Sequence, residues 1–142
     1  MEAMRVTYAF VCDDAHFRPD GQRLDVTGIH LAPIVFDAFP YEYANLSYVC
    51  AVYIPQDECR ADHTQRLYCL APDGTAIGTE TTYTIDASKG ARNPRGYRHV
   101  AIGDFFSFTF ATDGIYTFHT EFDGEEVDET PIRTVLLPES LP

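Results

Sequence analysis

Hydrophobic and polar residues alternate along most of the chain, which is typical of strands that bury one face. Near the N-terminus the apolar positions of this alternation are Val6, Tyr8, Phe10 and Cys12. The longest clean alternation has Leu46, Tyr48, Cys50, Val52 and Ile54 as its apolar positions. The residues between them include Val49, Ala51 and Tyr53, so we expect both faces of this strand to be covered.

Turn signals separate the alternating segments, because proline fixes φ and glycine accepts a positive φ. They are Pro19-Asp20-Gly21, Pro72-Asp73-Gly74, Thr112-Asp113-Gly114 and Asp123-Gly124. The pattern predicts strands over residues 6–12, 24–28, 46–54, 66–71, 79–86, 97–110, 116–122 and 132–137. We expect a bulge at Gly103-Asp104, an irregular crossover over residues 32–43 and a charged loop over residues 56–63. No segment predicts a helix.

About eight strands without a helix long enough for a crossover predict an all-β fold. We therefore expect one domain over residues 1–142, an antiparallel β-sandwich of the immunoglobulin-like or jelly-roll-like kind. Asp113-Gly114-Ile115-Tyr116 is similar to the tyrosine corner of such sandwiches, in which a tyrosine hydroxyl bonds to nearby backbone. The aspartate stands one residue later than is usual for that motif.

The order of these segments also carries a resemblance. The opening RVTYAFVCDDAHFRPDGQRLDVTGIH, the later APDGTAIG and the closing FTFATDGIYTFHTEFDGE with PIRTV follow one another along nearly the whole chain. In this order they resemble an uncharacterised bacterial family of small β-sandwich proteins. The chain departs from that pattern by a longer insert around Lys89–Arg98 and by Arg98-His99 where apolar residues are expected. The resemblance implies the sandwich fold and brings no activity and no catalytic residues.

Composition narrows the classes of function. The 142 residues are 45% hydrophobic, with 10 Phe and 9 Tyr, which is enough for a core. No apolar run is long enough to span a membrane, and the start MEAMRVTYAF lacks the features of a secretory signal, so we expect a cytoplasmic protein with its 4 cysteines reduced. With 22 acids against 10 bases, the net charge of −12 makes general binding to nucleic acid or anionic membranes unfavourable.

Basic residues are concentrated in one stretch, SKGARNPRGYRH, which runs from Ser88 to His99. Its bases recur every third residue and are Lys89, Arg92, Arg95 and Arg98. Because a guanidinium suits carboxylate or phosphate recognition, we hypothesise that these four residues and Tyr97 dock an acidic protein partner. Self-association is a variant of this hypothesis.

An acidic hairpin gives the alternative interpretation of the basic stretch. The hairpin carries Glu121, Asp123, Glu125, Glu126, Asp128 and Glu129. If each strand crosses the sandwich once, the basic loop and this hairpin lie at the same end, where they would compensate each other's charge. The carboxylate oxygens of the hairpin also suggest a calcium site. Their spacing matches no calcium loop, however, and a solvated turn explains them as well.

Catalytic chemistry has little support in the sequence. Cys59 and His63 are four residues apart and form the best local metal candidate, but a structural zinc site needs four ligands. No nucleophile elbow, phosphate-binding loop or dinucleotide-binding motif is present, so we expect neither an enzyme nor a cofactor. Carbohydrate binding usually uses tryptophan, which is absent, although Tyr41, Tyr43 and Tyr97 could replace it.

We therefore expect a non-catalytic protein-interaction module. A small-ligand or carbohydrate-binding sandwich is the alternative, and a metal-dependent enzyme is the third possibility. An interaction module should present a flat patch or an exposed strand edge, whereas a ligand binder should present a concave pocket with aromatic walls.

Overall fold

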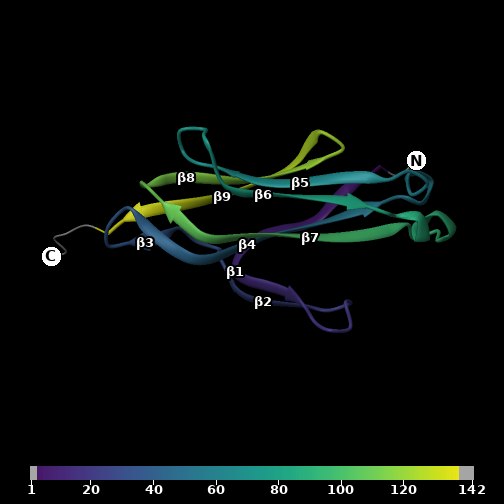
Figure 1. Ribbon diagram of the computed structural model, residues 1–142, viewed down its shortest axis with the longest axis horizontal. Helices are drawn as coiled ribbons and strands as arrows, with labels where there is room; N and C mark the ends of the chain where they lie inside the picture. The colour runs from purple at the N-terminus through teal and green to yellow at the C-terminus, as the bar shows by residue number, and fades with distance from the viewer. Residues whose placement is uncertain (1–2, 138–142) are drawn as a thin grey trace.

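Two stacked β-sheets form the body of the computed structural model, which describes residues 3–137 (Figure 1). The strands are β1 (Arg5–Phe17), β2 (Leu24–Ile29), β3 (Ile34–Phe36), β4 (Tyr41–Ile54), β5 (His63–Leu70), β6 (Ala76–Ile85), β7 (Tyr97–Phe110), β8 (Gly114–Phe122) and β9 (Glu125–Leu136). One sheet has the order β2-β1-β4-β7 and the other β3-β9-β8-β5-β6. The predicted β-sandwich is confirmed.

Aromatic rings fill the space between the two sheets. Tyr48 of β4, Phe105 of β7 and Phe118 of β8 are all buried there, and the Phe105 and Phe118 rings meet edge to face with centroids 5.3 Å apart. The two sheets therefore meet through aromatic rings, of which Tyr48 stands at an apolar position of the alternation described above.

The far face of β4 is covered as well, by the hairpin of β1 and β2. The first half of β1 pairs with β4 and its second half pairs with β2 in the same sheet, and the hairpin projects from the sandwich (Figure 1). Cys12 and Ala15 of this hairpin pack against Val49 and Ile102 in a second, smaller apolar cluster. The expectation that both faces of this strand are covered is confirmed.

The predicted strands and the observed ones differ in three places. Residues 32–43 are not wholly irregular, because β3 lies within them and β4 begins at Tyr41. This short β3 pairs with β9 in parallel, so the sandwich is mostly rather than wholly antiparallel. In addition, β9 starts at Glu125 and contains Pro131, so the acidic hairpin is part of the sheet.

The predicted bulge at Gly103-Asp104 is wrong. Both residues stay in register with β4, where Gly103 pairs with Tyr48 and Asp104 with Ser47. The backbone irregularity of β7 instead falls at Ser107, which has a φ of 51°.

The hydrogen bond expected of a tyrosine corner, from the tyrosine hydroxyl to nearby backbone, is confirmed. The Tyr116 hydroxyl donates a hydrogen bond to the Thr112 carbonyl at 2.9 Å and accepts one from the Thr112 N–H at 3.2 Å.

Apart from strands, the described chain has two short 3₁₀ turns, η1 (Gln56–Glu58) and η2 (Ser88–Arg92). None of its helical turns has the length and apolar character needed to cross a membrane.

Candidate functional site

The basic stretch forms an anchored connection between β6 and β7. Its first part is η2, where Gly90 is buried so tightly that an added Cβ would lie 2.6 Å from the Cys59 thiol sulfur. The side-chain amide of Gln56 donates to the Ala91 carbonyl at 3.1 Å, which ties η2 to η1. The loop is therefore attached to the body of the protein through its small residues.

Local hydrogen bonds then fix the path of the loop up to β7. The N–H groups of Asn93 and Gly96 donate to the carbonyls three residues before them, Gly90 and Asn93. The Asn93 side chain accepts a further bond from the Arg95 N–H at 2.9 Å. Consequently the exposed arginines stand on a hydrogen-bonded backbone, which limits the entropy that binding would cost.

Strand register places a second cation beside this loop. Tyr53 of β4 pairs with Arg98 of β7 on one side and with Arg5 of β1 on the other. Three directly opposed residues share one face of a sheet, so the two arginines flank the tyrosine at roughly 10 Å between their Cα atoms. The Arg5 guanidinium lies over the Tyr53 ring, 4.2 Å from its centre.

Arg95 completes a surface pocket with these residues. The pocket has a volume of about 530 Å³, and we name it the arginine pocket; it is lined by Arg5, Tyr53, Pro94, Arg95, Gly96 and Arg98. All three arginines are exposed. Among residues 3–137 no carboxylate forms an ion pair with any of the three, whereas Arg18 and Arg23 each have one such partner and Arg66 has two. The arginine pocket therefore has the chemistry of an anion-binding site.

Gly96 is the residue that shapes the floor of the arginine pocket. It has a φ of +70°, and an added Cβ would lie 2.3 Å from the Ile54 carbonyl oxygen and 3.1 Å from the Tyr53 ring. The loop backbone thus passes directly over the end of β4, which brings Arg95 and Arg98 to Tyr53.

The other predicted members of the basic surface lie next to the arginine pocket. Lys89 and Arg92 are exposed on η2, and Tyr97 is partly buried against the core at the start of β7. Of the five predicted docking residues, the structure brings Arg95 and Arg98 together with Arg5.

The acidic hairpin lies at the same end of the sandwich as the basic loop, as strand topology predicts. The end of β8 pairs with the start of β5, which pairs with the end of β6. Nevertheless, no ion pair within residues 3–137 joins the hairpin to the basic loop. Glu121 binds Arg66 at 2.8 Å, Asp123 binds His63 at 2.6 Å, and Glu126 binds His119.

Asp128 of the acidic hairpin has a structural contact instead. Its carboxylate accepts hydrogen bonds from the buried Tyr48 hydroxyl at 2.5 Å and from Thr130 at 2.8 Å. Glu125 and Glu129 are exposed. Four of the six acids thus have separate partners, and no group of three or more potential metal ligands occurs in the described part of the chain.

The metal candidates Cys59 and His63 each have other partners. The Cys59 thiol is buried and donates to the Ile54 and Pro55 carbonyls. Both ring nitrogens of His63 face acceptors, the Asp123 carboxylate and the Glu58 carbonyl, each at 2.6 Å. Burial lowers the pKa of His63, but these two hydrogen bonds outweigh it and raise the pKa above its ordinary value.

The tyrosines considered for sugar stacking do not gather at one site. Tyr41 and Tyr43 line one open pocket with Asp13, while Tyr97 lies beside the basic loop. The Tyr43 hydroxyl donates to Asp13 at 2.7 Å, and the Tyr41 ring stacks on Phe36 with centroids 4.5 Å apart. Tyr41 is therefore the one of the pair whose ring is substantially exposed, at 45%.

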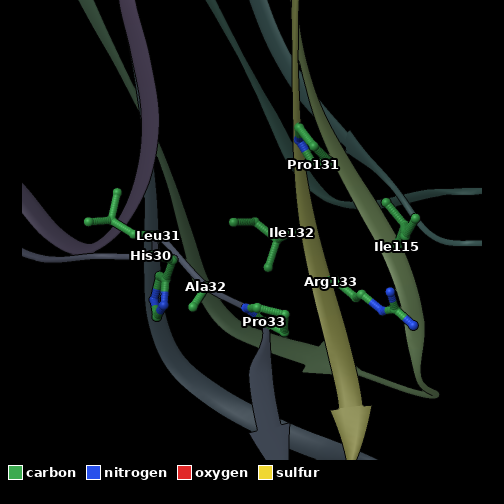
Figure 2. A pocket seen from close by; sticks show the side chains of 8 residues that line it. All are labelled: His30, Leu31, Ala32, Pro33, Ile115, Pro131, Ile132 and Arg133. Carbon is green, nitrogen blue, oxygen red and sulfur yellow. The ribbon is translucent and has the colours of Figure 1, made fainter.

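Another pocket lies between the β2–β3 connection and strands β8 and β9 of the second sheet (Figure 2). Its volume is about 280 Å³ and its walls are mostly aliphatic. Figure 2 shows Ile132 reaching from β9 toward Leu31 and Ala32, whereas Arg133 points away toward β8. No tyrosine or phenylalanine lines this pocket, so it lacks the aromatic walls that we expected of a ligand-binding sandwich.

Sequence reasoning missed Arg5 and Tyr53 as members of the arginine pocket. Arg5 occupies an ordinary polar position at the start of an alternating segment, and Tyr53 an ordinary apolar one. The signal that unites them with Arg98 is the register of three strands, which the sequence pattern does not reveal.

Comparison with known proteins gives one family and no function. The model of a family of unknown function, DUF6941, matches residues 7–135. No curated protein matches the chain. A solved structure described as "Crystal structure of the C-terminal domain of wzt" is similar at 10% identity with a TM-score of 0.46, over 99% of this chain and 77% of that one.

Proposed function

This chain belongs to DUF6941, a family of unknown function, and for this member we propose a non-catalytic interaction module that docks an acidic segment of a partner protein in the arginine pocket. The observation that carries the proposal is the gathering of Arg5, Arg95 and Arg98 around Tyr53. Six of the nine arginines have no ion-pair partner within residues 3–137, and these three are distinguished by lying together around one ring.

Charge and geometry both favour a carboxylate-bearing partner. Guanidinium groups bind carboxylates through paired hydrogen bonds, and the ordered loop presents Arg95 and Arg98 without rearrangement. Nucleic acid fits less well, because the excess of acids over the remaining surface repels a phosphate backbone. The same excess repels an acidic peptide everywhere else, so such a peptide is directed to the arginine pocket.

A labelled hexaglutamate peptide tests the proposal by fluorescence anisotropy. We expect the peptide to bind the wild type and to bind the double variant Arg95→Ala/Arg98→Ala about tenfold or more weakly, since each lost charged pair costs roughly 0.5–1 kcal/mol or more. Arg60→Ala/Arg133→Ala is the matched control, because it removes two exposed arginines and the same charge elsewhere.

Two results would overturn the proposal. The first is equal weakening in the two double variants, which would mean that only the overall charge matters. The second is the absence of binding to the wild type.

A further inference from the structure

A second pocket adjoins the arginine pocket at Arg98. Its volume is about 430 Å³, and we name it the aromatic pocket; it is lined by Phe17, Gly21, Gln22, Tyr83, Tyr97, Arg98, His99 and Val100. Phe17, Gly21 and Gln22 come from the β1–β2 hairpin, and Tyr83 comes from β6 of the opposite sheet. The two pockets therefore form one surface on either side of Arg98.

The aromatic pocket lies along the backbone edge of β7. Four consecutive residues, 97–100, line it, whereas successive side chains of a strand point to opposite faces. A pocket over one face would be lined by alternate residues only. Since β7 is the last strand of its sheet, no strand of that sheet pairs with this edge in the described chain. An extended peptide can pair with such an edge by main-chain hydrogen bonds.

The walls of the aromatic pocket are held in place and are largely uncharged. The Tyr83 hydroxyl donates to the Ile102 carbonyl at 2.6 Å, and the His99 ring is 3.0 Å from the Gln65 side-chain oxygen. Burial lowers the pKa of His99, which keeps the imidazole neutral. Phe17, in contrast, is 45% exposed. Arg98 is thus the charged group of this pocket, and Phe17 leaves apolar surface for a ligand to cover.

We propose that the two pockets together bind one extended peptide segment of a partner, with an acidic side chain in the arginine pocket and a bulky apolar side chain in the aromatic pocket. This deepens the proposed function and rests on it. Residues 95–100 of an extended chain span roughly 15–20 Å, which matches a segment of about five or six residues lying alongside. The acidic residue of the peptide pairs with the arginines, and its apolar residue determines where the peptide lies along β7.

The test compares hexaglutamate with a hexapeptide in which one central glutamate is replaced by phenylalanine. The replacement removes a negative charge, so electrostatics alone predicts weaker binding to the arginine pocket. We expect binding that is tighter by about threefold to tenfold, because partial burial of a phenylalanine contributes roughly 1 kcal/mol. The variant Phe17→Ala should abolish this advantage, so that the mixed peptide no longer binds more tightly than hexaglutamate.

Phe106→Ala is the matched control, because Phe106 lies on the same strand and is 74% exposed, yet it lines neither pocket. Two results would overturn this inference and leave the proposed function standing. One is hexaglutamate that binds at least as tightly as the mixed peptide. The other is an equal effect of Phe17→Ala and Phe106→Ala on binding of the mixed peptide. N-acetylphenylalanine that binds as tightly as the mixed peptide would also overturn it, in favour of a small ligand. Insensitivity of hexaglutamate binding to Arg95→Ala/Arg98→Ala overturns the proposed function itself, as does the absence of binding by either peptide.

Discussion

The guanidinium of Arg5 lies 4.2 Å above the centre of the Tyr53 ring. This contact joins β1 to β4, its neighbour in the sheet, directly beside Arg98. The ring holds one cation close to another that would repel it in open solvent. The arginine pocket therefore depends on a tyrosine that is itself 8% exposed and belongs to the sheet.

Replacing Arg5 tests the energy of this contact. We expect Arg5→Ala to lower the free energy of unfolding by about 0.5–1 kcal/mol, the usual contribution of an exposed cation–π pair. Urea unfolding measures the change. Arg133→Ala, which removes an exposed arginine from β9, should change stability by less than about 0.5 kcal/mol. Equal effects of the two substitutions would contradict a role for the ring.

Gly96 should be intolerant of any side chain. Gly96→Ala places a Cβ 2.3 Å from the Ile54 carbonyl and strains a φ of +70°, so we expect a loss of at least 2 kcal/mol, roughly the upper range for a strained residue. Gly21→Ala is the control, since Gly21 has a similar φ of +68° with nothing within 4 Å of the added Cβ. Its loss should be about 1 kcal/mol. Similar losses in urea unfolding would show that the contact with β4 is unimportant.

The tyrosine corner is a second stability test. The Tyr116 ring is 1% exposed, and its hydroxyl closes the turn before β8 through Thr112. Because Tyr116→Phe removes two hydrogen bonds and keeps the ring, we expect a loss of about 1–2 kcal/mol by urea unfolding. Tyr8→Phe, on a ring that is 40% exposed, should leave stability nearly unchanged. If Tyr116→Phe leaves the free energy of unfolding unchanged, the turn keeps its shape without the hydroxyl.

Substitutions of the acidic residues in the hairpin should differ in how much stability they remove, according to whether the carboxylate has a buried partner. Asp128→Ala removes the acceptor of the buried Tyr48 hydroxyl, which then keeps only Thr120 at 2.8 Å. We expect this variant to lose about 1–3 kcal/mol, the usual result of leaving a buried polar group poorly paired. Glu129→Ala, at an exposed position, should lose less than about 0.5 kcal/mol. A thermal or urea denaturation that ranks the two variants in the opposite order would contradict this assignment.

The strands were largely predictable because their period of two is a local property. Tyr48 falls on the buried face that alternation assigns to it. The failures arise where distant residues decide the outcome. Gly103-Asp104, for example, resembles a bulge in the sequence, but both residues pair in register with β4.

The candidate site was predictable only in part for the same reason. The cluster of bases around Arg95 and Arg98 is visible in the sequence, since they are neighbours along the chain. Arg5 and Phe17 join them through the pairing of β1 with β4 and with β2, although they are about eighty to ninety positions away along the chain. The sequence likewise placed the acidic hairpin at the correct end, but the partners of its carboxylates follow from side-chain geometry.

His63 should give the fold a measurable dependence on pH. Hydrogen bonds with Asp123 and with the Glu58 carbonyl raise the pKa of His63 in spite of its burial. A histidine with a raised folded-state pKa stabilises the protein fully below its unfolded pKa, about 6.5, and this contribution is lost as the pH rises through the folded value. Asp123→Asn removes the charge, while asparagine can still accept the Thr64 N–H and adopt the φ of 51°. We expect the stability advantage of the wild type over Asp123→Asn, measured by urea unfolding, to shrink as the pH rises from about 5.5 to 8.5. An advantage that stays constant or grows over this range would exclude the charged His63–Asp123 pair as its source.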